Sequence, residues 1–246
     1  MTAAKGTKDN VTAGENVYQY LRTSVLELQV KPGQTININE LSNFLGVSRS
    51  PIRDALIQLA KDGLVTTTPQ KSTIVSKIDI ARARDERFMR ACVEERVLEE
   101  FLDCYTPENI ETLKDLLTRQ QQAIKERDTR RFLRADDDFH SVFYYATNHP
   151  FSLQNILNMS GHYLRIRLLS LSQRDVCEQS LQQHWEILQL IQAKDRSAIR
   201  ETIKAHIVEK KGEEAFMTRK YPDLFTGLKE EELRPKIWEE DFLRSV

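Results

Sequence analysis

Residues 41–65 read LSNFLGVSRSPIRDALIQLAKDGLV, and their pattern indicates the architecture of the N-terminal part of the chain. Gly46 closes one short helical segment. Ser48 or Ser50 can cap the next one, in which Pro51 occupies an early position that a helix tolerates. The apolar residues of this second segment share one helical face: Ile52, Ala55, Leu56, Leu59 and Ala60. The stretch therefore predicts two helices joined by a tight turn.

The flanking segments complete a small domain. A helix precedes the quoted stretch, because apolar residues recur there at helical spacing: Val17, Leu21, Val25 and Leu28. Residues 64–68 and 73–76 are rich in β-branched side chains and flank a polar turn, which is typical of a β-hairpin. Three helices followed by a hairpin are the order of a winged helix-turn-helix domain. We predict that domain over residues 16–78, after a flexible tail at residues 1–15.

The start of the third helix has the chemistry of a DNA-reading surface. Two arginines lie on its first turn, the end that a recognition helix offers to the major groove, where arginine bonds guanine edges. Either arginine alone has an alternative interpretation as an ordinary surface residue, but the joint pattern favours DNA. Residues 1–78 also hold nine Lys and Arg against six Asp and Glu. The predicted DNA-binding residues are Arg49, Ser50, Arg53, Ser48, Gln70 and Lys71.

Composition limits the class of protein. A chain of 246 residues is long enough for two modest domains, and 8 Gly and 7 Pro argue against a turn-rich all-β fold. No apolar run reaches the ~18 residues of a membrane helix, and the first residues lack the apolar core of a secretory signal. The 3 Cys are scattered without a CxxC pair. We expect a soluble, intracellular, cytoplasmic protein without disulfides.

The rest of the chain is predicted to be an all-helical bundle over residues 79–220, so the fold class is mainly α. Helical periodicity dominates from residue 80 onward, and Thr106-Pro107-Glu108 is a helix start signal. The expected helices span about 80–104, 107–124, 128–147, 151–174, 178–193 and 196–219. Residues 221–246 form a C-terminal extension that the sequence does not place.

Three histidines and an aspartate in this bundle form a candidate metal site. Asp136 and His140 are four residues apart on one helix, so they share a face. His184 and His206 lie in two later helices. Imidazoles together with a carboxylate suit Zn²⁺, Ni²⁺, Fe²⁺ or Mn²⁺, although any single histidine has the alternative interpretation of a surface or core residue. The remaining two histidines fit helix ends and are expected to be structural: His149 and His162.

Both halves of the chain resemble one family of regulators. Residues 16–78 resemble the DNA-binding domain of GntR-type transcriptional regulators, on the quoted stretch and on the wing QKSTIVSKI, where Ser72 stands in place of the family's usual glycine. The helical region is similar to the FCD ligand-binding domain of the FadR-like subfamily. Metal-binding members of that subfamily carry Asp-x3-His on one helix and a His in each of two later helices. Positions 136, 140, 184 and 206 match that order.

The resemblance implies how such a protein works. It implies one divalent metal ion per chain on Asp136, His140, His184 and His206, next to a cavity that binds a small carboxylate effector. It also implies a homodimer on a palindromic double-stranded DNA operator. Arg90 is predicted to face the cavity, with an ion pair to Glu94 as the alternative, and Arg165 and Arg167 are further candidates. A metal-dependent enzyme and a metal sensor are the rival hypotheses. The enzyme is disfavoured, because the chain shows no separate general acid or nucleophile motif.

Overall fold

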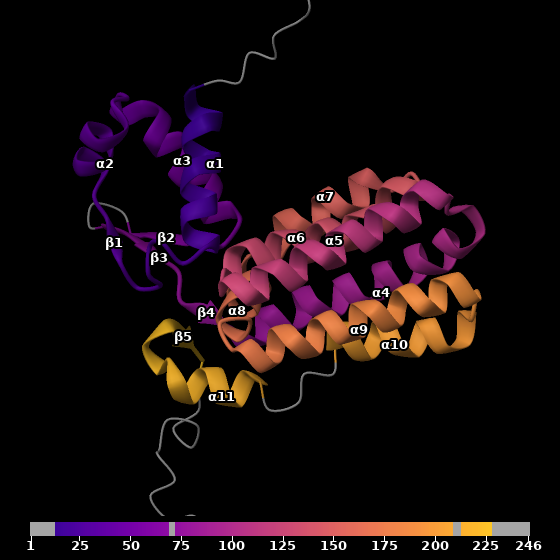
Figure 1. Cartoon of the computed structure of the whole chain (residues 1–246). Coiled ribbons are helices and arrows are strands. Elements are labelled where there is room, and N and C mark those ends of the chain that lie inside the picture. Colours follow the sequence, from indigo (N-terminus) through magenta and orange to yellow (C-terminus); the bar gives the residue numbers. More distant parts are fainter. Residues whose placement is uncertain (1–12, 69–71, 209–212, 228–246) are drawn as a thin grey trace, which may run out of the picture. The chain divides into compact units, whose positions relative to one another are not determined.

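The computed structural model describes residues 13–68, 72–208 and 213–227 of the chain. It divides into two compact units, residues 1–76 and residues 77–246 (Figure 1). The boundary falls two residues before the position predicted from the sequence. The predicted flexible tail lies outside the described residues, except for the first turn of the first helix.

Unit 1 is a three-helix domain with a small sheet. It contains α1 (Ala13–Leu26), α2 (Ile38–Leu45) and α3 (Arg49–Lys61). The sheet is antiparallel, in the order β1 (Thr35–Ile36), β3 (Ser72–Val75), β2 (Val65–Thr68). The hairpin agrees with the prediction, and Ser72 opens its second strand. The third strand, β1, was not predicted, because two residues are too short to show an alternating pattern.

Local signals explain the helix ends in unit 1. The Asn37 side chain accepts the backbone N–H of Asn39 at 2.9 Å, which caps α2. Gly46 ends α2 in the left-handed region with φ +66°, a conformation that glycine adopts without steric cost. At the end of α1, Leu28 has φ +55° and lies beyond the helix, so the predicted continuation of α1 through this residue is wrong. The core of unit 1 is formed by α1, α3 and the sheet: Val17, Leu21, Val25, Ile52, Leu56, Leu59, Val65 and Val75.

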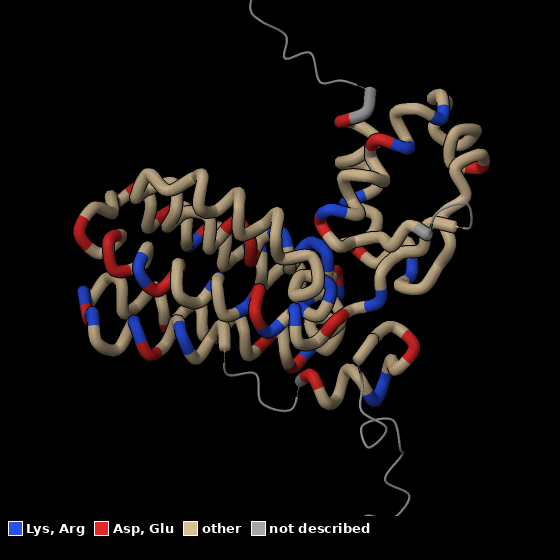
Figure 2. The backbone as a smooth tube through the Cα atoms, turned by 180° about the vertical axis from the view of Figure 1, so that it is seen from behind, with Lys and Arg blue, Asp and Glu red and all other residues tan. Residues whose placement is uncertain are grey.

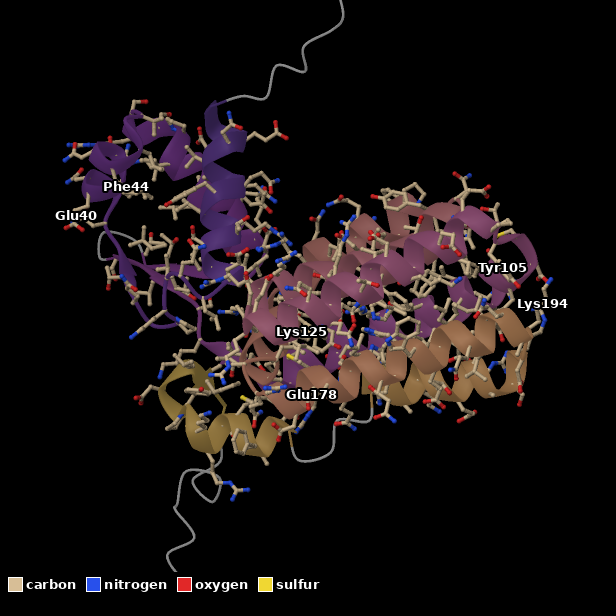
Figure 3. The ribbon with its side chains drawn as sticks, viewed as in Figure 1. Glu40, Phe44, Tyr105, Lys125, Glu178 and Lys194 are labelled. Atoms are coloured by element: carbon tan, nitrogen blue, oxygen red, sulfur yellow. The ribbon has the colours of Figure 1, made fainter. Side chains whose placement is uncertain are left out.

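Unit 2 is a helical bundle. Its helices are α4 (Ile80–Cys104), α5 (Pro107–Glu126), α6 (Thr129–Ala146), α7 (Pro150–Met159), α8 (Gly161–Ser170), α9 (Arg174–Ala193), α10 (Arg196–Val208) and α11 (Glu213–Lys220). Acidic and basic residues are interspersed along its helices (Figure 2). Lys125 and Glu178 mark one end of the bundle, and Tyr105 and Lys194 mark the other (Figure 3). The core is aliphatic and aromatic: Leu98, Phe101, Leu113, Leu117, Phe139, Phe143, Ile187, Ile191 and Ile203.

The predicted single helix over residues 151–174 is wrong, because it divides at Ser160 into α7 and α8. The backbone of Ser160 leaves the helical region (φ −91°, ψ 30°), and a carboxylate from another helix supports the new start. Glu86 of α4 accepts the backbone N–H groups of His162 and Tyr163 at 2.9 and 2.8 Å. These two amides have no partner within their own helix, so Glu86 acts as a cap supplied from outside. The segment 196–219 is likewise described as two helices, α10 and α11.

A two-stranded parallel sheet connects the beginning of unit 2 with the last residues that the structure describes. β4 (Ile78–Asp79) pairs with β5 (Phe225–Thr226), which follows a short 3₁₀ helix at Pro222–Leu224. Ile78 and Phe225 are both buried in a separate cluster with Met217 of α11. Part of the C-terminal extension is therefore packed against the residues that follow the wing. The two aromatic residues noted there, Trp238 and Phe242, lie outside the described residues.

Candidate nucleic-acid interface and metal centre

The start of α3 is an exposed, basic surface on a well-anchored helix. Arg49 is the first residue of α3 and Arg53 follows one turn later, and both are exposed. Ile52, between them, is fully buried, which fixes the rotation of the helix and directs the arginines outward. Ser48 occupies the N-cap position without a side-chain cap bond, so its hydroxyl is not used by the fold. The turn before it is held instead by Ser42 Oγ, which donates to the Val47 carbonyl at 2.6 Å.

A wide groove of about 660 Å³ runs between the start of α3 and the sheet of unit 1. Its lining is polar or basic apart from two isoleucines: Thr35, Ile36, Asn37, Ile38, Asn39, Arg49, Arg53, Thr67, Ser72 and Thr73. The groove therefore places both arginines beside the strands of the wing. Gln70 and Lys71, predicted at the wing tip, lie outside the described residues.

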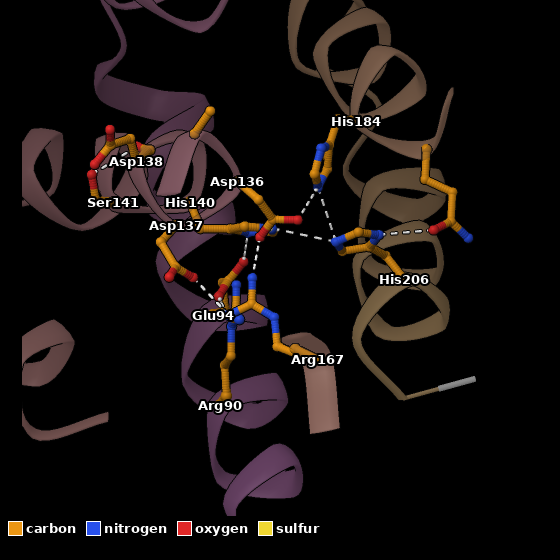
Figure 4. Close-up of polar contacts among 12 residues, drawn as sticks. Arg90, Glu94, Asp136, Asp137, Asp138, His140, Ser141, Arg167, His184 and His206 are labelled. Atoms are coloured by element: carbon orange, nitrogen blue, oxygen red, sulfur yellow. Dashed lines mark hydrogen bonds and ion pairs between the residues drawn. The ribbon is translucent and has the colours of Figure 1, made fainter. Parts of the chain in front are cut away.

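The structure brings the four candidate metal ligands together. Asp136 and His140 project from α6, His184 from α9 and His206 from α10, and one ligand atom of each lies within 4.8 Å of the others (Figure 4). The His206 Nε2 atom is 3.1 Å from Nε2 of His184 and 3.3 Å from Nε2 of His140. Oxygens of Asp136 lie 3.7 Å from Nε2 of His140 and of His184. All four side chains are buried.

Each imidazole is oriented by an oxygen atom at its other nitrogen. His140 Nδ1 bonds to Glu94. His184 Nδ1 bonds to Gln120 Oε1 at 2.7 Å, and His206 Nδ1 bonds to Gln183 Oε1 at 2.9 Å. The Gln120 amide is itself fixed, because its nitrogen donates to the Ala135 carbonyl at 3.3 Å.

These contacts favour the tautomer with its N–H at Nδ1 in all three rings. A neutral imidazole has one N–H, and an oxygen acceptor at Nδ1 places it there. In that tautomer the three Nε2 lone pairs point toward one another beside the Asp136 carboxylate. Without a cation, such an arrangement is repulsive. Three nitrogens and one carboxylate oxygen, held by hydrogen-bonded partners, are the donor set of a divalent transition-metal site.

Buried charges surround the centre. Arg167 bonds to Asp136 and, at 2.6 Å, to Asp137, while Arg90 Nε donates to Glu94 Oε2 at 3.0 Å. Burial acts to raise the pKa of Glu94, but the charges of His140 and Arg90 outweigh it and lower this pKa to about 2. Burial also opposes ionisation of Asp136, yet Arg167 and the neighbouring histidines hold its pKa below its ordinary value. Apart from the imidazoles, three carboxylates (Glu94, Asp136 and Asp137) face two guanidinium groups, a balance that suits a bound cation.

A small cavity of about 20 Å³ adjoins the centre. Arg90, Arg167 and Tyr144 line it together with apolar side chains of α7. The hydrogen bond to Glu94 is the only one that Arg90 makes among the described residues, although its side chain is only 9% exposed. Tyr144 Oη is buried without a hydrogen-bond partner, and burial, followed by the Glu94 charge, raises the pKa of this phenol. Guanidinium N–H groups of Arg90 and the hydroxyl of Tyr144 are therefore available to a ligand in this cavity.

Arg165, predicted as an effector contact, does not line this cavity. Its Nε donates to the Gly161 carbonyl at 3.0 Å and its Nη2 lies 3.2 Å from Nδ1 of His162. Arg167, two residues later and so on a different face of α8, occupies the cavity side. The two other histidines have structural contacts: His149 Nε2 bonds to Glu100 at 2.9 Å, and His162 Nδ1 accepts the Asp79 N–H at 2.9 Å.

The residues that orient the imidazoles were not predicted from the sequence. Glu94 was considered only as an ion-pair partner of Arg90, a contact that the structure contains. Gln120 and Gln183 showed no signal, because a glutamine on a helix is usually solvated and its partner here is distant in sequence. Tyr144 is four residues after His140 and so lies on the same helical face, which is the one signal that could have identified it.

Comparisons with known proteins agree with this architecture. The chain matches the model of the gntR family of bacterial regulatory proteins over residues 13–75 and that of the FCD domain over residues 87–209. It is 32% identical over 196 residues to an HTH-type transcriptional regulator in an unstable DNA locus of Streptomyces ambofaciens, covering 80% of this chain and 82% of the relative. It is 28% identical over 195 residues to the HTH-type transcriptional repressor RspR of Escherichia coli K12, covering 79% and 86%.

Solved structures share the fold. E. coli McbR/YncC superposes with a TM-score of 0.70 at 19% identity, covering 86% of this chain and 99% of that one. A GntR transcriptional regulator from Rhodococcus sp. RHA1 has a TM-score of 0.64 at 18% identity, covering 80% and 94%. The relatives are transcriptional regulators and not enzymes, and the predicted mainly α fold class is confirmed. The chain belongs to the GntR family of bacterial transcriptional regulators, with a winged helix-turn-helix domain followed by an FCD domain.

Proposed function

We propose that this regulator binds a palindromic operator as a homodimer, in the cytoplasm, and responds to a small carboxylate in a metal-containing cavity of unit 2. One observation carries the proposal. The Nε2 atoms of the three imidazoles converge on one point beside Asp136, while an oxygen atom engages each Nδ1. Packing alone would not require three imidazole nitrogens and a carboxylate oxygen to lie within 4.8 Å of one another.

Asp136, His140, His184 and His206 would hold one divalent ion, with Zn²⁺, Ni²⁺, Mn²⁺ and Fe²⁺ as the candidates that suit nitrogen and carboxylate ligands. A bound ion would supply a coordination position for an effector carboxylate. Glu94, Gln120 and Gln183 keep the rings in the ligating tautomer, and Arg167 orients the Asp136 carboxylate. The proposed ligands and the side chains that orient them come from six helices, α4, α5, α6, α8, α9 and α10.

The unused donors of the cavity indicate how the effector is recognised. A guanidinium group has five N–H donors in a planar fork that matches a carboxylate, and the described contacts of Arg90 use only one of them. The Tyr144 hydroxyl suits a second oxygen atom, as in a hydroxy or keto acid. Because about 20 Å³ holds roughly one water molecule, the effector is small and its entry displaces the apolar wall of α7. Arg167 replaces Arg165 in this effector-binding set.

Unit 1 would read DNA with the first turn of α3. Arg49 and Arg53 contact bases, while Ser48 and Ser50 contact phosphates with hydroxyls that the fold leaves exposed. Gln70 and Lys71 remain predicted contacts at the wing tip. Two heads related by a two-fold axis would match a palindromic operator.

Elemental analysis tests the metal centre. The parent and the His149→Ala variant should each hold one divalent ion per chain, whereas His140→Ala and His206→Ala should lose it. His149 is a matched control because its side chain is 41% exposed and contacts Glu100 instead of the centre. A metal-free parent after gentle purification, or equal loss in all three variants, would contradict the site.

Two conservative variants test effector recognition, with thermal shift of the metal-loaded protein and operator affinity as readouts. Arg90→Lys keeps a cation beside Glu94 but loses the fork, so it should weaken binding of every small carboxylate. Tyr144→Phe removes a hydroxyl that has no partner, so it should leave stability unchanged and weaken only acids with a second oxygen group. If operator affinity followed metal concentration alone, the ion itself would be the signal and the carboxylate proposal would be wrong.

A further inference from the structure

We propose that unit 2 has a second ligand site, apart from the metal centre, which binds an amphipathic carboxylate. The site is a cavity of about 340 Å³ at the end of the bundle where α5 meets α6 and α8 meets α9. Lys125 and Glu178 mark this end in Figure 3. Small-molecule pockets span roughly 300–1,000 Å³, so this cavity has the size of a ligand site, in contrast to the cavity of about 20 Å³ at the metal centre.

The floor of the cavity is apolar and contributed by several helices. Its members are Ala123, Ile124, Phe132, Leu171 and Cys177. They form a cluster separate from the main core of the bundle. Each is at most 9% exposed, so the floor is held by packing. A floor of this kind binds hydrocarbon.

The polar groups near the floor already have partners within the fold. Cys177 Sγ donates to the Leu171 carbonyl at 3.0 Å, and the Thr129 hydroxyl reaches the same carbonyl at 3.5 Å. The Asp128 carboxylate accepts the Arg131 N–H at 2.9 Å and caps α6. These polar groups therefore already serve the fold, which favours a ligand with an apolar body.

The rim of the cavity has more basic than acidic side chains, with two arginines beside the exposed carboxylate of Asp128. Arg127 and Arg174 line it, and both are exposed. Arg174 Nε donates to Glu178 at 2.7 Å, whereas the Arg127 guanidinium has no hydrogen bond or ion pair among the described residues. Residues 125–134 read KERDTRRFLR, with five basic and two acidic side chains, although the chain as a whole has a net charge of −1. The excess of positive charge at this end of the bundle favours binding of an anionic head group.

The backbone conformation of Arg127 allows a substitution that removes its charge and preserves the fold. Arg127 caps α5 in the left-handed region (φ 56°, ψ 32°), where glycine is the residue that helices favour. Lys194 caps α9 in the same conformation (φ 55°, ψ 32°) at the opposite end of the bundle (Figure 3). Glycine at either position removes a cation and is compatible with the fold. Lys194→Gly is therefore a matched control for Arg127→Gly.

The experiment is calorimetric titration of the full chain with hexanoate, octanoate and decanoate, and with 1-octanol as the uncharged analogue. Affinity for the parent should rise about fourfold per methylene until the cavity is filled, and octanoate should bind more tightly than octanol. The double variant Arg127→Gly/Arg174→Ala should lose this preference for the charged ligand and bind octanoate about tenfold more weakly. Lys194→Gly should bind as the parent does, and all variants should keep the parent melting temperature to within a few degrees.

A further variant separates this site from the metal centre. His206→Ala disables the proposed metal site and should bind octanoate with parental affinity. Loss of octanoate binding in His206→Ala would place the ligand at the metal centre and overturn the proposal. Equal affinity in the double variant and in Lys194→Gly, or an affinity independent of chain length, would overturn it as well. Failure of the metal proposal would leave these octanoate results unaffected.

Discussion

The two units of this regulator use arginine in opposite ways. On α3, Arg49 and Arg53 are exposed and contribute nothing to the core of unit 1. At the centre of unit 2, Arg90 and Arg167 are 7% and 5% exposed, and each is paired with a carboxylate that contacts a histidine. An exposed ion pair contributes about 0–1 kcal/mol to stability. Breaking a buried pair costs about 3–5 kcal/mol, because it leaves an uncompensated charge. Function is therefore separable from stability in unit 1 and coupled to it in unit 2.

The largest effect is expected at Asp136. Asp136→Ala removes one proposed metal ligand and leaves Arg167 buried with only its bond to Asp137. We expect loss of the metal and a fall of about 3–5 kcal/mol in the free energy of unfolding of unit 2, measured by urea denaturation. Asp138→Ala, an exposed neighbour on the same helix, should change stability by less than about 0.5 kcal/mol. Equal losses of stability in Asp136→Ala and Asp138→Ala would show that the buried ion pair does not couple function to stability in unit 2.

A smaller effect, confined to DNA, is expected at the start of α3. Arg49→Ala or Arg53→Ala should weaken operator binding by about 1–3 kcal/mol, roughly ten- to a hundredfold, through loss of a guanine contact. The melting temperature should not change, because both side chains are exposed. Fluorescence anisotropy with a labelled operator at fixed salt measures the affinity. Lys61→Ala, at the exposed far end of α3, is the charge-matched control, and an equal loss there would show that only net charge matters.

Two cap positions should differ from each other by about 1 kcal/mol. Asn37 caps α2 through its side chain, so Asn37→Ala should destabilise unit 1 by about 1 kcal/mol. Ser48 stands at the corresponding position of α3 without a cap bond, so Ser48→Ala should change stability by less than about 0.5 kcal/mol while weakening operator binding. Thermal denaturation of both variants checks the first statement. A destabilised Ser48→Ala protein would show that this hydroxyl serves the fold.

The smallest effect is expected at Tyr18, whose hydroxyl donates to Asp62 at 2.7 Å. Burial, then the hydrogen bond and charge of Asp62, raises the pKa of Tyr18 to about 12. The pKa of Tyr18 is higher in the folded protein than its unfolded value of about 10. The hydrogen bond to Asp62 therefore stabilises unit 1 fully below pH ~10, and this stabilisation is lost as the pH rises toward 12. It should amount to at most about 1 kcal/mol, because the contact is partly solvated. Tyr18→Phe should abolish this alkaline dependence, and an unchanged profile would contradict the assignment.

Sequence patterns were informative where a structural feature depends on local spacing. Asp136 and His140 could be paired because four residues on a helix fix their common face. The choice between Arg165 and Arg167 could not be made in this way. Nearly every residue of α8 is buried, so the helix has no polar face from which its rotation could be predicted. Gln120 became a partner of His184 only through the packing of α5 against α9, which no local pattern encodes.

The short strands illustrate the same limit. β1 and β4 each contain two residues, which is too few for an alternating apolar pattern. Their existence depends on a partner strand that arrives from elsewhere in the chain: β3 for β1, and β5 for β4. The division of residues 151–174 at Ser160 has a similar cause, since the cap of α8 comes from Glu86 on a different helix.

The pairing of β4 with β5 has a consequence for the order in which the chain matures on the ribosome. Ile78 is synthesised directly after the wing, but its partner Phe225 emerges only after the whole helical bundle has been made. Unit 1 depends on contacts among its own residues and can fold while translation continues. Strand β4, which follows unit 1, can pair only after β5 has been synthesised. A nascent chain halted before residue 225 would therefore carry a folded unit 1, followed by a β4 strand whose partner β5 has not yet been synthesised.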